Sequence, residues 1–129
     1  MLNELKVKKI NVATLSEEML DYWVAKADEL IPYREDDRAK YWLVDLPNKP
    51  ATIIGPAPKG IPSESRYSPS TNWSQGGPII EEESICPHRT IVKWEASIDG
   101  VTLGEGETAL IAAMRAYVTF KFGEEVDEV

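Results

Sequence analysis

The sequence predicts an α+β domain in which two amphipathic helices pack on a small, mostly antiparallel sheet. Three observations carry this prediction. Apolar residues recur three or four positions apart in two segments, 19–31 and 110–122, and they alternate with polar residues in 92–98. The dipeptide Asp99-Gly100 predicts a hairpin turn, because both residues tolerate positive φ. A chain of 129 residues fits one domain, residues 1–129.

The first helix is predicted to begin near Thr14 and to end at Pro32. Thr14 can cap the first free N–H groups while Glu17 reaches back, which is the spacing of a capping box. The buried stripe would consist of Met19, Leu20, Trp23, Val24, Ala27, Leu30 and Ile31. Before the helix, residues 5–12 show broken alternation and are predicted as a first strand.

A long loop, about residues 47–78, interrupts the regular pattern. Seven of the nine prolines and four of the eight glycines fall in it, so long helices or strands are not expected there. Aromatic and branched residues predict a strand at 41–46, and 51–55 is the one plausible strand inside the loop. A loop of this length in a small domain is usually functional or disordered.

Strands and a second helix are predicted after the loop. Residues 79–83 and 90–98 read as strands, and 101–103 would pair back onto the second of them. The last helix begins near Glu107 or Thr108, and Gly123 fits its C-terminal cap. Its buried face would consist of Leu110, Ile111, Met114, Tyr117, Val118 and Phe122.

The formal net charge of −8 argues against binding of duplex DNA through its phosphates, which requires clustered Lys and Arg. The acids are spread along the chain, so they favour a solvated surface, with mimicry of a nucleic-acid backbone as the alternative. No apolar run approaches the roughly 18 residues of a membrane span. The N-terminus does not read as a signal peptide, and a single cysteine suits a reducing compartment. We therefore expect a cytoplasmic protein that contacts neither nucleic acid nor a membrane directly.

Catalytic and metal-binding signals are weak. Cys86 and His88 are the single cysteine and histidine, and two ligands are too few for a structural zinc site. Pro87 between them leaves the geometry of a nucleophile–base pair open. The acids Glu81–Glu83 would alternate faces on a strand, which is typical of solvated residues. We expect no catalytic set, no metal and no cofactor.

The segment Tyr67–Pro78, YSPSTNWSQGGP, has the densest set of groups suited to ligand binding. Its two rings could stack on a base or sugar, and Gly76-Gly77 lets backbone approach an anion closely. Arg115 on the last helix could reach a phosphate or carboxylate bidentately. The predicted ligand-binding residues are Tyr67, Ser68, Ser70, Thr71, Asn72, Trp73, Gln75, Gly76, Gly77 and Arg115.

Three alternatives to ligand binding remain for these residues. The two rings could plug the core while the short polar side chains close turns. The segment could instead contact a protein. Arg115 could pair with one of the many surface acids.

Several sequence blocks resemble the NinX-like family of small phage proteins. They occur in the family's order and are YWVAKA in the first helix, YSPSTNWSQGGPII, and LIAAMRAYVTFKFG at the end. The resemblance implies a phage- or prophage-encoded accessory protein that acts in the bacterial host cytoplasm. No activity is established for the family, so no catalytic residue is carried over.

The leading hypothesis is a non-catalytic phage accessory protein that binds a small polar, nucleotide-like ligand and so acts as a sponge for a host defence signal. One alternative is an acidic interaction module, or nucleic-acid mimic, that binds a host protein. Another is a small hydrolase of a nucleotide-like substrate that uses His88 or Glu81–Glu83. A homodimer is compatible with the sequence.

Overall fold

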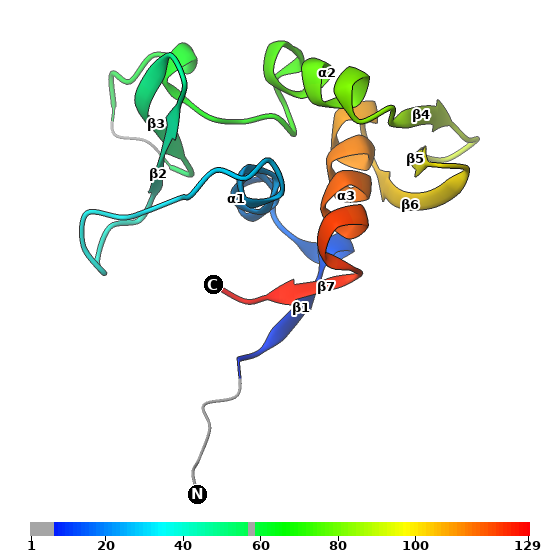
Figure 1. Ribbon diagram of the computed structural model, residues 1–129, viewed down its shortest axis with the longest axis horizontal. Coiled ribbons are helices and arrows are strands. Elements are labelled where there is room, and N and C mark those ends of the chain that lie inside the picture. Colours follow the sequence, from blue (N-terminus) through cyan, green and yellow to red (C-terminus); the bar gives the residue numbers. More distant parts are fainter. Residues whose placement is uncertain (1–6, 57–58) are drawn as a thin grey trace, which may run out of the picture.

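The computed structural model describes residues 7–56 and 59–129, and in these residues three helices and three small antiparallel sheets surround one core (Figure 1). The helices are α1 (Glu17–Ala27), α2 (Trp73–Glu82) and α3 (Ala109–Phe122), with short 3-10 turns η1 (Val12–Thr14) and η2 (Ser63–Ser65). The strands are β1 (Lys9–Asn11), β2 (Trp42–Leu46), β3 (Lys49–Ile54), β4 (Cys86–Arg89), β5 (Trp94–Ile98), β6 (Val101–Gly106) and β7 (Glu125–Asp127). The predicted α+β class is confirmed, but the prediction of two helices is wrong, because α2 is a third.

The described strands form three separate sheets instead of one. β1 pairs with β7, β2 with β3, and β4-β5-β6 form a meander, all antiparallel. Figure 1 shows the β2–β3 hairpin on one side of α1 and the three-stranded sheet on the far side of α3. Helices α1 and α3 therefore lie between the β2–β3 hairpin and the three-stranded sheet.

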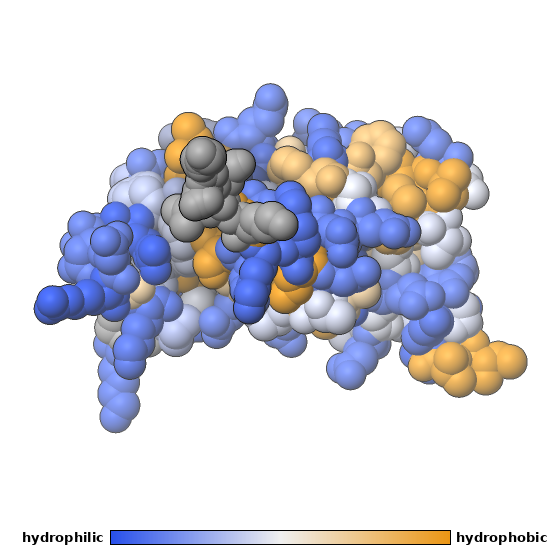
Figure 2. Space-filling model, turned by 90° about the horizontal axis from the view of Figure 1, so that it is seen from below, coloured by the Kyte–Doolittle hydropathy of each residue, from blue (hydrophilic) through white to orange (hydrophobic). Residues whose placement is uncertain are grey.

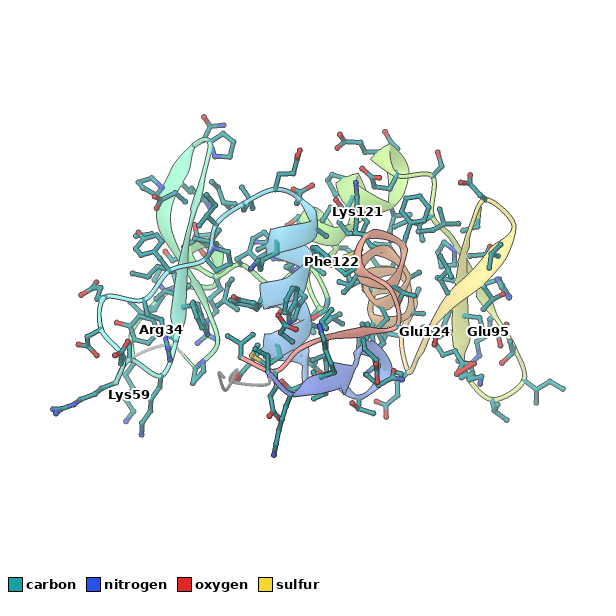
Figure 3. The ribbon with its side chains drawn as sticks, turned by 60° about the horizontal axis from the view of Figure 1, so that its bottom comes forward. Arg34, Lys59, Glu95, Lys121, Phe122 and Glu124 are labelled. Carbon is teal, nitrogen blue, oxygen red and sulfur yellow. The ribbon has the colours of Figure 1, made fainter. Side chains whose placement is uncertain are left out.

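The helix α3 forms the centre of the core. Nine of its residues are buried, on every side of the helix, so it is covered by β5 and β6, by α1 and by α2. Its last residue, Phe122, packs edge-on against Trp23 of α1, with ring centroids 5.3 Å apart (Figure 3). Tyr22 continues the contact to Trp42 of β2 at 4.7 Å. A row of aromatic rings thus joins α3, α1 and the β2–β3 hairpin.

The first helix begins later and ends earlier than predicted. Ser16 is its N-cap, and the Ser16 hydroxyl accepts the Met19 N–H at 3.2 Å. Thr14 lies in η1 instead, where its hydroxyl donates to the Asn11 carbonyl. The helix stops at Ala27, and Glu29 adopts a positive φ of 64°. Of the strand predicted at 5–12, Lys9–Asn11 is present as β1, and residues 5 and 6 lie outside the described residues.

The strand predicted at 79–83 is wrong, because residues 79–82 belong to α2. Asn72 caps this helix, and the buried Ile79 turns toward the core. Residues 79–83 are two apolar residues followed by three acids, and this pattern fits a short strand and the end of a helix equally well. Hydrophobic periodicity therefore could not distinguish a strand from a helix here. The predicted strand 90–98 is shortened to β5, since Thr90 and Lys93 close a turn through a backbone bond of 2.8 Å.

The hairpin turn and the end of the last helix are confirmed. Asp99 and Gly100 have φ of 52° and 81°, and β6 pairs back onto β5. Thr108 caps α3, and Gly123 ends it with a φ of 94°. The face of the molecule seen in Figure 2 is mostly hydrophilic, in line with the acidic composition, with apolar residues gathered at a few places.

Candidate functional site

The two aromatic rings of segment 67–78 lie in opposite environments. Tyr67 is 5% exposed, and its hydroxyl has no hydrogen-bond partner among the described residues. Burial, with the nearby carboxylates of Asp28 and Asp21, raises the pKa of Tyr67, so the phenol stays protonated. Trp73, the first residue of α2, is 57% exposed. Tyr67 therefore fills the core, and Trp73 is the ring that a ligand can reach.

The short polar side chains of the segment bind its own backbone. The Gln75 amide oxygen accepts the Ser68 N–H at 2.6 Å, and its amide nitrogen donates to the Arg66 carbonyl at 2.7 Å. The Asn72 side chain accepts the Ser74 N–H at 2.9 Å and so caps α2. These contacts fix the turn before α2, as the structural alternative for the segment predicted.

The two glycines of the segment lie inside α2. A Cβ on Gly76 would touch the Pro69 carbonyl oxygen and lie 2.5 Å from Leu110 Cδ2, so only glycine lets α2 pack this closely. The Gly76 N–H donates to the Asn72 carbonyl at 2.9 Å and is therefore not free for an anion. A Cβ on Gly77 would meet only the Trp73 ring, at an ordinary 3.8 Å.

Alanine at these two glycines should have unequal effects. Gly76→Ala should lower the free energy of unfolding by about 2 kcal/mol, because the new methyl group overlaps backbone and Leu110. Gly77→Ala should change it by less than about 1 kcal/mol, because the gain in helix propensity is offset by Pro78, which disfavours helical backbone for a residue with a Cβ before it. Urea denaturation of both variants measures the difference. A Gly76→Ala variant as stable as wild type would contradict the described packing of α2.

Ser70 is held in the core by Asp21 of α1. The Ser70 N–H donates to Asp21 Oδ1 at 2.8 Å, and both residues are buried. Burial raises the pKa of Asp21 to about 7; the Ser70 N–H opposes this rise, and the negative charges of Glu17 and Glu18 add to it. The Ser70 hydroxyl lies near the same carboxylate and also opposes the rise of its pKa, although its geometry is outside that of a strict hydrogen bond.

Arg115 lies on the side of α3 that faces β6 and the start of α1. Its Nη1 donates to the Glu105 carbonyl at 2.9 Å and its Nη2 to the Leu15 carbonyl at 3.5 Å, while Nε is buried without a partner. Burial lowers the pKa of Arg115, and the charge of Glu107 raises it. Within the described chain, the ion pairs join Lys9 with Asp127, His88 with Glu95, and Lys93 with Glu105. The pairing of Arg115 with a surface acid is therefore not observed.

Two adjoining cavities meet at Arg115, and we call them together the Arg115 cleft. One, of about 240 Å³, lies between η1 and β6, and the other, of about 550 Å³, extends to the first turn of α1 and to the β4–β5 turn. Both are lined by Ala13, Glu105 and Arg115. Ligand sites commonly measure about 300–1,000 Å³, so the cleft has the size of a site for a small molecule.

The walls of the Arg115 cleft differ in chemistry. One wall of the larger cavity is apolar, formed by Leu15, Val92 and Ile111. Two cations line the cleft, Lys93 and Arg115. Four carboxylates also line it: Glu17, Glu105, Glu107 and Glu124. Glu124 follows α3, and its carbonyl accepts the Val12 N–H of η1 (Figure 3).

The predicted binding residues are divided between two places. Tyr67, Ser68 and Thr71 line a separate cavity of about 170 Å³ together with Asp21, and Arg115 does not line it. The two cavities of the Arg115 cleft contain no residue of 67–77 in their lining. A role in ligand binding for the residues of 67–77 stays a prediction.

Cys86 and His88 lie two apart on the edge strand β4. His88 Nε2 lies 3.2 Å from Glu95 Oε1 on β5, and Cys86 Sγ lies 3.9 Å from the Ser84 carbonyl oxygen. Neither side chain bonds the other in the described structure, so they do not form a nucleophile–base pair. The described residues also contain no group of three or more His, Cys, Asp or Glu side chains suited to a metal ion.

Sequence reasoning missed Asp21, Lys93 and Glu105. Asp21 lies three positions before Val24 and four before Ala25, so it shares a helix face with these two fully buried residues. An acidic residue on the buried face of α1 was the signal that could have indicated Asp21. Lys93 and Glu105 come together only through the pairing of β5 with β6, and no local pattern shows this.

The fold and cleft define a small α+β protein that packs a central helix between sheets and has no helix, in its described part, long and apolar enough to cross a membrane. The family model described as "Bacteriophage P22, NinX" matches residues 11–121. The chain therefore belongs to the NinX family of phage proteins, as its sequence blocks predicted. The matched range includes Asp21 and Arg115. No curated protein matches the chain.

Proposed function

We propose that this NinX-family protein is a non-catalytic accessory protein that binds a small polar, negatively charged ligand in the Arg115 cleft. One observation carries the proposal: the half-buried guanidinium of Arg115 has only backbone carbonyl partners, although the chain has a net charge of −8. Among the described residues the guanidinium has no carboxylate within ion-pair distance, so a ligand phosphate or carboxylate can pair with it directly.

The remaining lining narrows the class of ligand. Four carboxylates against two cations disfavour a bare polyanion such as inorganic phosphate. They favour a molecule that joins one anionic group to hydroxyl or amino donors, which the carboxylates can accept. The apolar wall of Leu15, Val92 and Ile111 suits a planar ring. A nucleotide derivative has all three parts.

Binding without turnover fits the absence of a nucleophile–base pair at Cys86 and His88 in the described structure. A phage protein that binds a nucleotide derivative without converting it acts by withholding that molecule from another protein. In this role it is a sponge for a nucleotide-derived host signal.

A thermal-shift and calorimetric screen tests the proposal. The probes are nucleoside monophosphates, cyclic nucleotides, ADP-ribose and inorganic phosphate, at low ionic strength. A nucleotide derivative should raise the melting temperature more than phosphate does, and Arg115→Gln should weaken its binding about tenfold or more, because a charge-assisted hydrogen bond is lost. Arg38→Gln removes the same charge from an exposed loop and should leave binding unchanged.

Two further variants check that the ligand binds in the Arg115 cleft. Lys93→Gln should also weaken binding, and it avoids the structural bonds that Arg115 makes. Trp73→Ala should have no effect, since Trp73 does not line the cleft. A ligand lost with Trp73→Ala but kept with Arg115→Gln would move the site to segment 67–78. The proposal fails if no probe stabilises the protein.

A further inference from the structure

A further cavity lies over Asp21 and shares one lining residue, Glu17, with the Arg115 cleft. It measures about 170 Å³ and is enclosed by the first turns of α1, the end of β3 and residues 66–71. Since one water occupies about 30 Å³ in the liquid, this space takes about five waters or one molecule of a few heavy atoms. Asp21, 5% exposed, contributes its carboxylate to the wall.

The Asp21 carboxylate has no ion-pair partner in the described residues, although the cation Arg66 lines the same cavity. Asp21 accepts one bond, from the Ser70 N–H, and the charges that act on it are those of Glu17 and Glu18, which have the same sign. In residues 7–56 and 59–129, none of these three acids forms an ion pair, and Arg66, which also lines the cavity, forms none either. Buried carboxylates are normally paired, so a cationic partner is missing.

One buried hydroxyl group in the wall of this cavity also has no partner. Tyr67 lines the cavity and is 5% exposed, and its hydroxyl forms no hydrogen bond in the described chain. An unsatisfied buried polar atom is costly and rare in native proteins, and it commonly marks an absent partner. A hydroxyl oxygen can accept a hydrogen bond from a ligand N–H.

The acceptors suit a nitrogen cation better than a metal ion. Carboxylate and hydroxyl oxygens accept from the three N–H bonds of an ammonium or the five of a guanidinium group. A metal needs several carboxylates converging on one point, and the described residues contain no such group.

We propose that the Asp21 cavity binds a small organic cation through an ammonium or guanidinium group. The Asp21 carboxylate pairs with the charge, and Glu17, Glu18 and the Tyr67 hydroxyl are further acceptors. This site takes a ligand of the opposite charge to that of the Arg115 cleft, and it stands whether or not the proposed function holds.

Proton release is the expected signature of binding. The charged and titratable groups around Asp21 are Glu17 and Glu18 from α1 and Arg66 and Tyr67 from the segment after η2. Ser70 adds its N–H and hydroxyl, and Ile53 of β3 and Gly55 after it carry no charge. Because burial raises the pKa of Asp21 to about 7, its carboxylate is half protonated near neutral pH. Methylguanidinium stays charged throughout, so its affinity should rise about tenfold from pH 6 to pH 8 as Asp21 ionises.

Nuclear magnetic resonance titration with methylguanidinium and methylammonium, at constant ionic strength, tests the proposal. The Ser70 and Thr71 amide signals should shift until binding saturates. The probe should also lower the pKa of Asp21, read from the chemical shift of its carboxyl carbon. Tetramethylammonium is the control ligand, because it has the charge but no N–H donor. Asp21→Asn should abolish saturable binding, whereas Asp37→Asn, which removes the same charge from an exposed loop, should not.

Three results would overturn the proposal. One is an equal response to tetramethylammonium, which would indicate charge screening alone. Another is unchanged binding by Asp21→Asn. The third is an Asp21 pKa that does not move with either probe, a measurement that needs no variant. Arg115→Gln should leave this titration unchanged, so the two sites are tested separately.

Discussion

The free energy of unfolding should fall as the pH rises from 4 to 7, and Asp21→Asn should remove most of that fall. Burial raises the pKa of Asp21 from 3.8 to about 7, so in this window the folded protein keeps a proton that the unfolded chain releases. The folded state binds more protons, and stability must therefore decrease with pH until the folded carboxyl has ionised. Three pKa units correspond to roughly 4 kcal/mol.

Above pH 7 the wild type should stay at its lower stability while Asp21→Asn stays high. Asparagine keeps an oxygen that accepts the Ser70 N–H, and it cannot ionise. Urea denaturation at pH 5 and pH 8 measures the effect, with Asp37→Asn as the variant that should keep the wild-type slope. Desolvation also raises the pKa of Asp28, so a shallower slope of the same sign should persist. An Asp21→Asn variant less stable than wild type at pH 8 would contradict this account.

Gly104→Ala should cost about 3 kcal/mol of stability, the other large expected effect. A Cβ at Gly104 would overlap the Ala112 carbonyl oxygen and lie 2.5 Å from the Ala116 nitrogen, both of them backbone atoms of α3. Backbone cannot rotate away as a side chain can, so β6 would have to move off the helix.

The same denaturation measurement checks this prediction. Gly77→Ala is the comparison, since a Cβ there meets no backbone of another element and should cost far less. The loss should appear in the denaturation midpoint without a change of slope if the fold is kept. A loss under about 1 kcal/mol would show that β6 and α3 do not pack as closely as described.

The elements that could be predicted are those with a strong local signal. The extent of α3, with its Thr108 and Gly123 caps, and the Asp99-Gly100 turn are set by residues within a few positions of one another. The predicted one-sided buried face of α3 was wrong, because Ala112, Ala113 and Ala116 are also buried and Phe122 is 42% exposed. Helix α2 was not predicted, because it depends on the cap at Asn72 and on the packing of Gly76 against Leu110, a contact between residues far apart in sequence. The division into three sheets depends in the same way on β1 meeting β7 across the whole chain.

Arg115 was predicted to bind a ligand on the basis of its alanine neighbours, and that role stays a prediction. The structure places Arg115 at the junction of two cavities. Its separation from segment 67–78 could not be foreseen, because it follows from the side of α3 that β6 covers. Tyr67 and Trp73 looked alike in the sequence, and only the start of α2 between them turns one inward and the other outward.

The contact of Arg115 with Glu105 has a consequence for how the chain behaves at high concentration. Exposed strand edges invite pairing with another molecule, and the meander β4-β5-β6 has two of them. On β4, Pro87 has no N–H to offer a neighbouring strand. On β6, the guanidinium occupies the Glu105 carbonyl. Both edges are thus obstructed against strand addition, and loss of Arg115 would open one of them to aggregation.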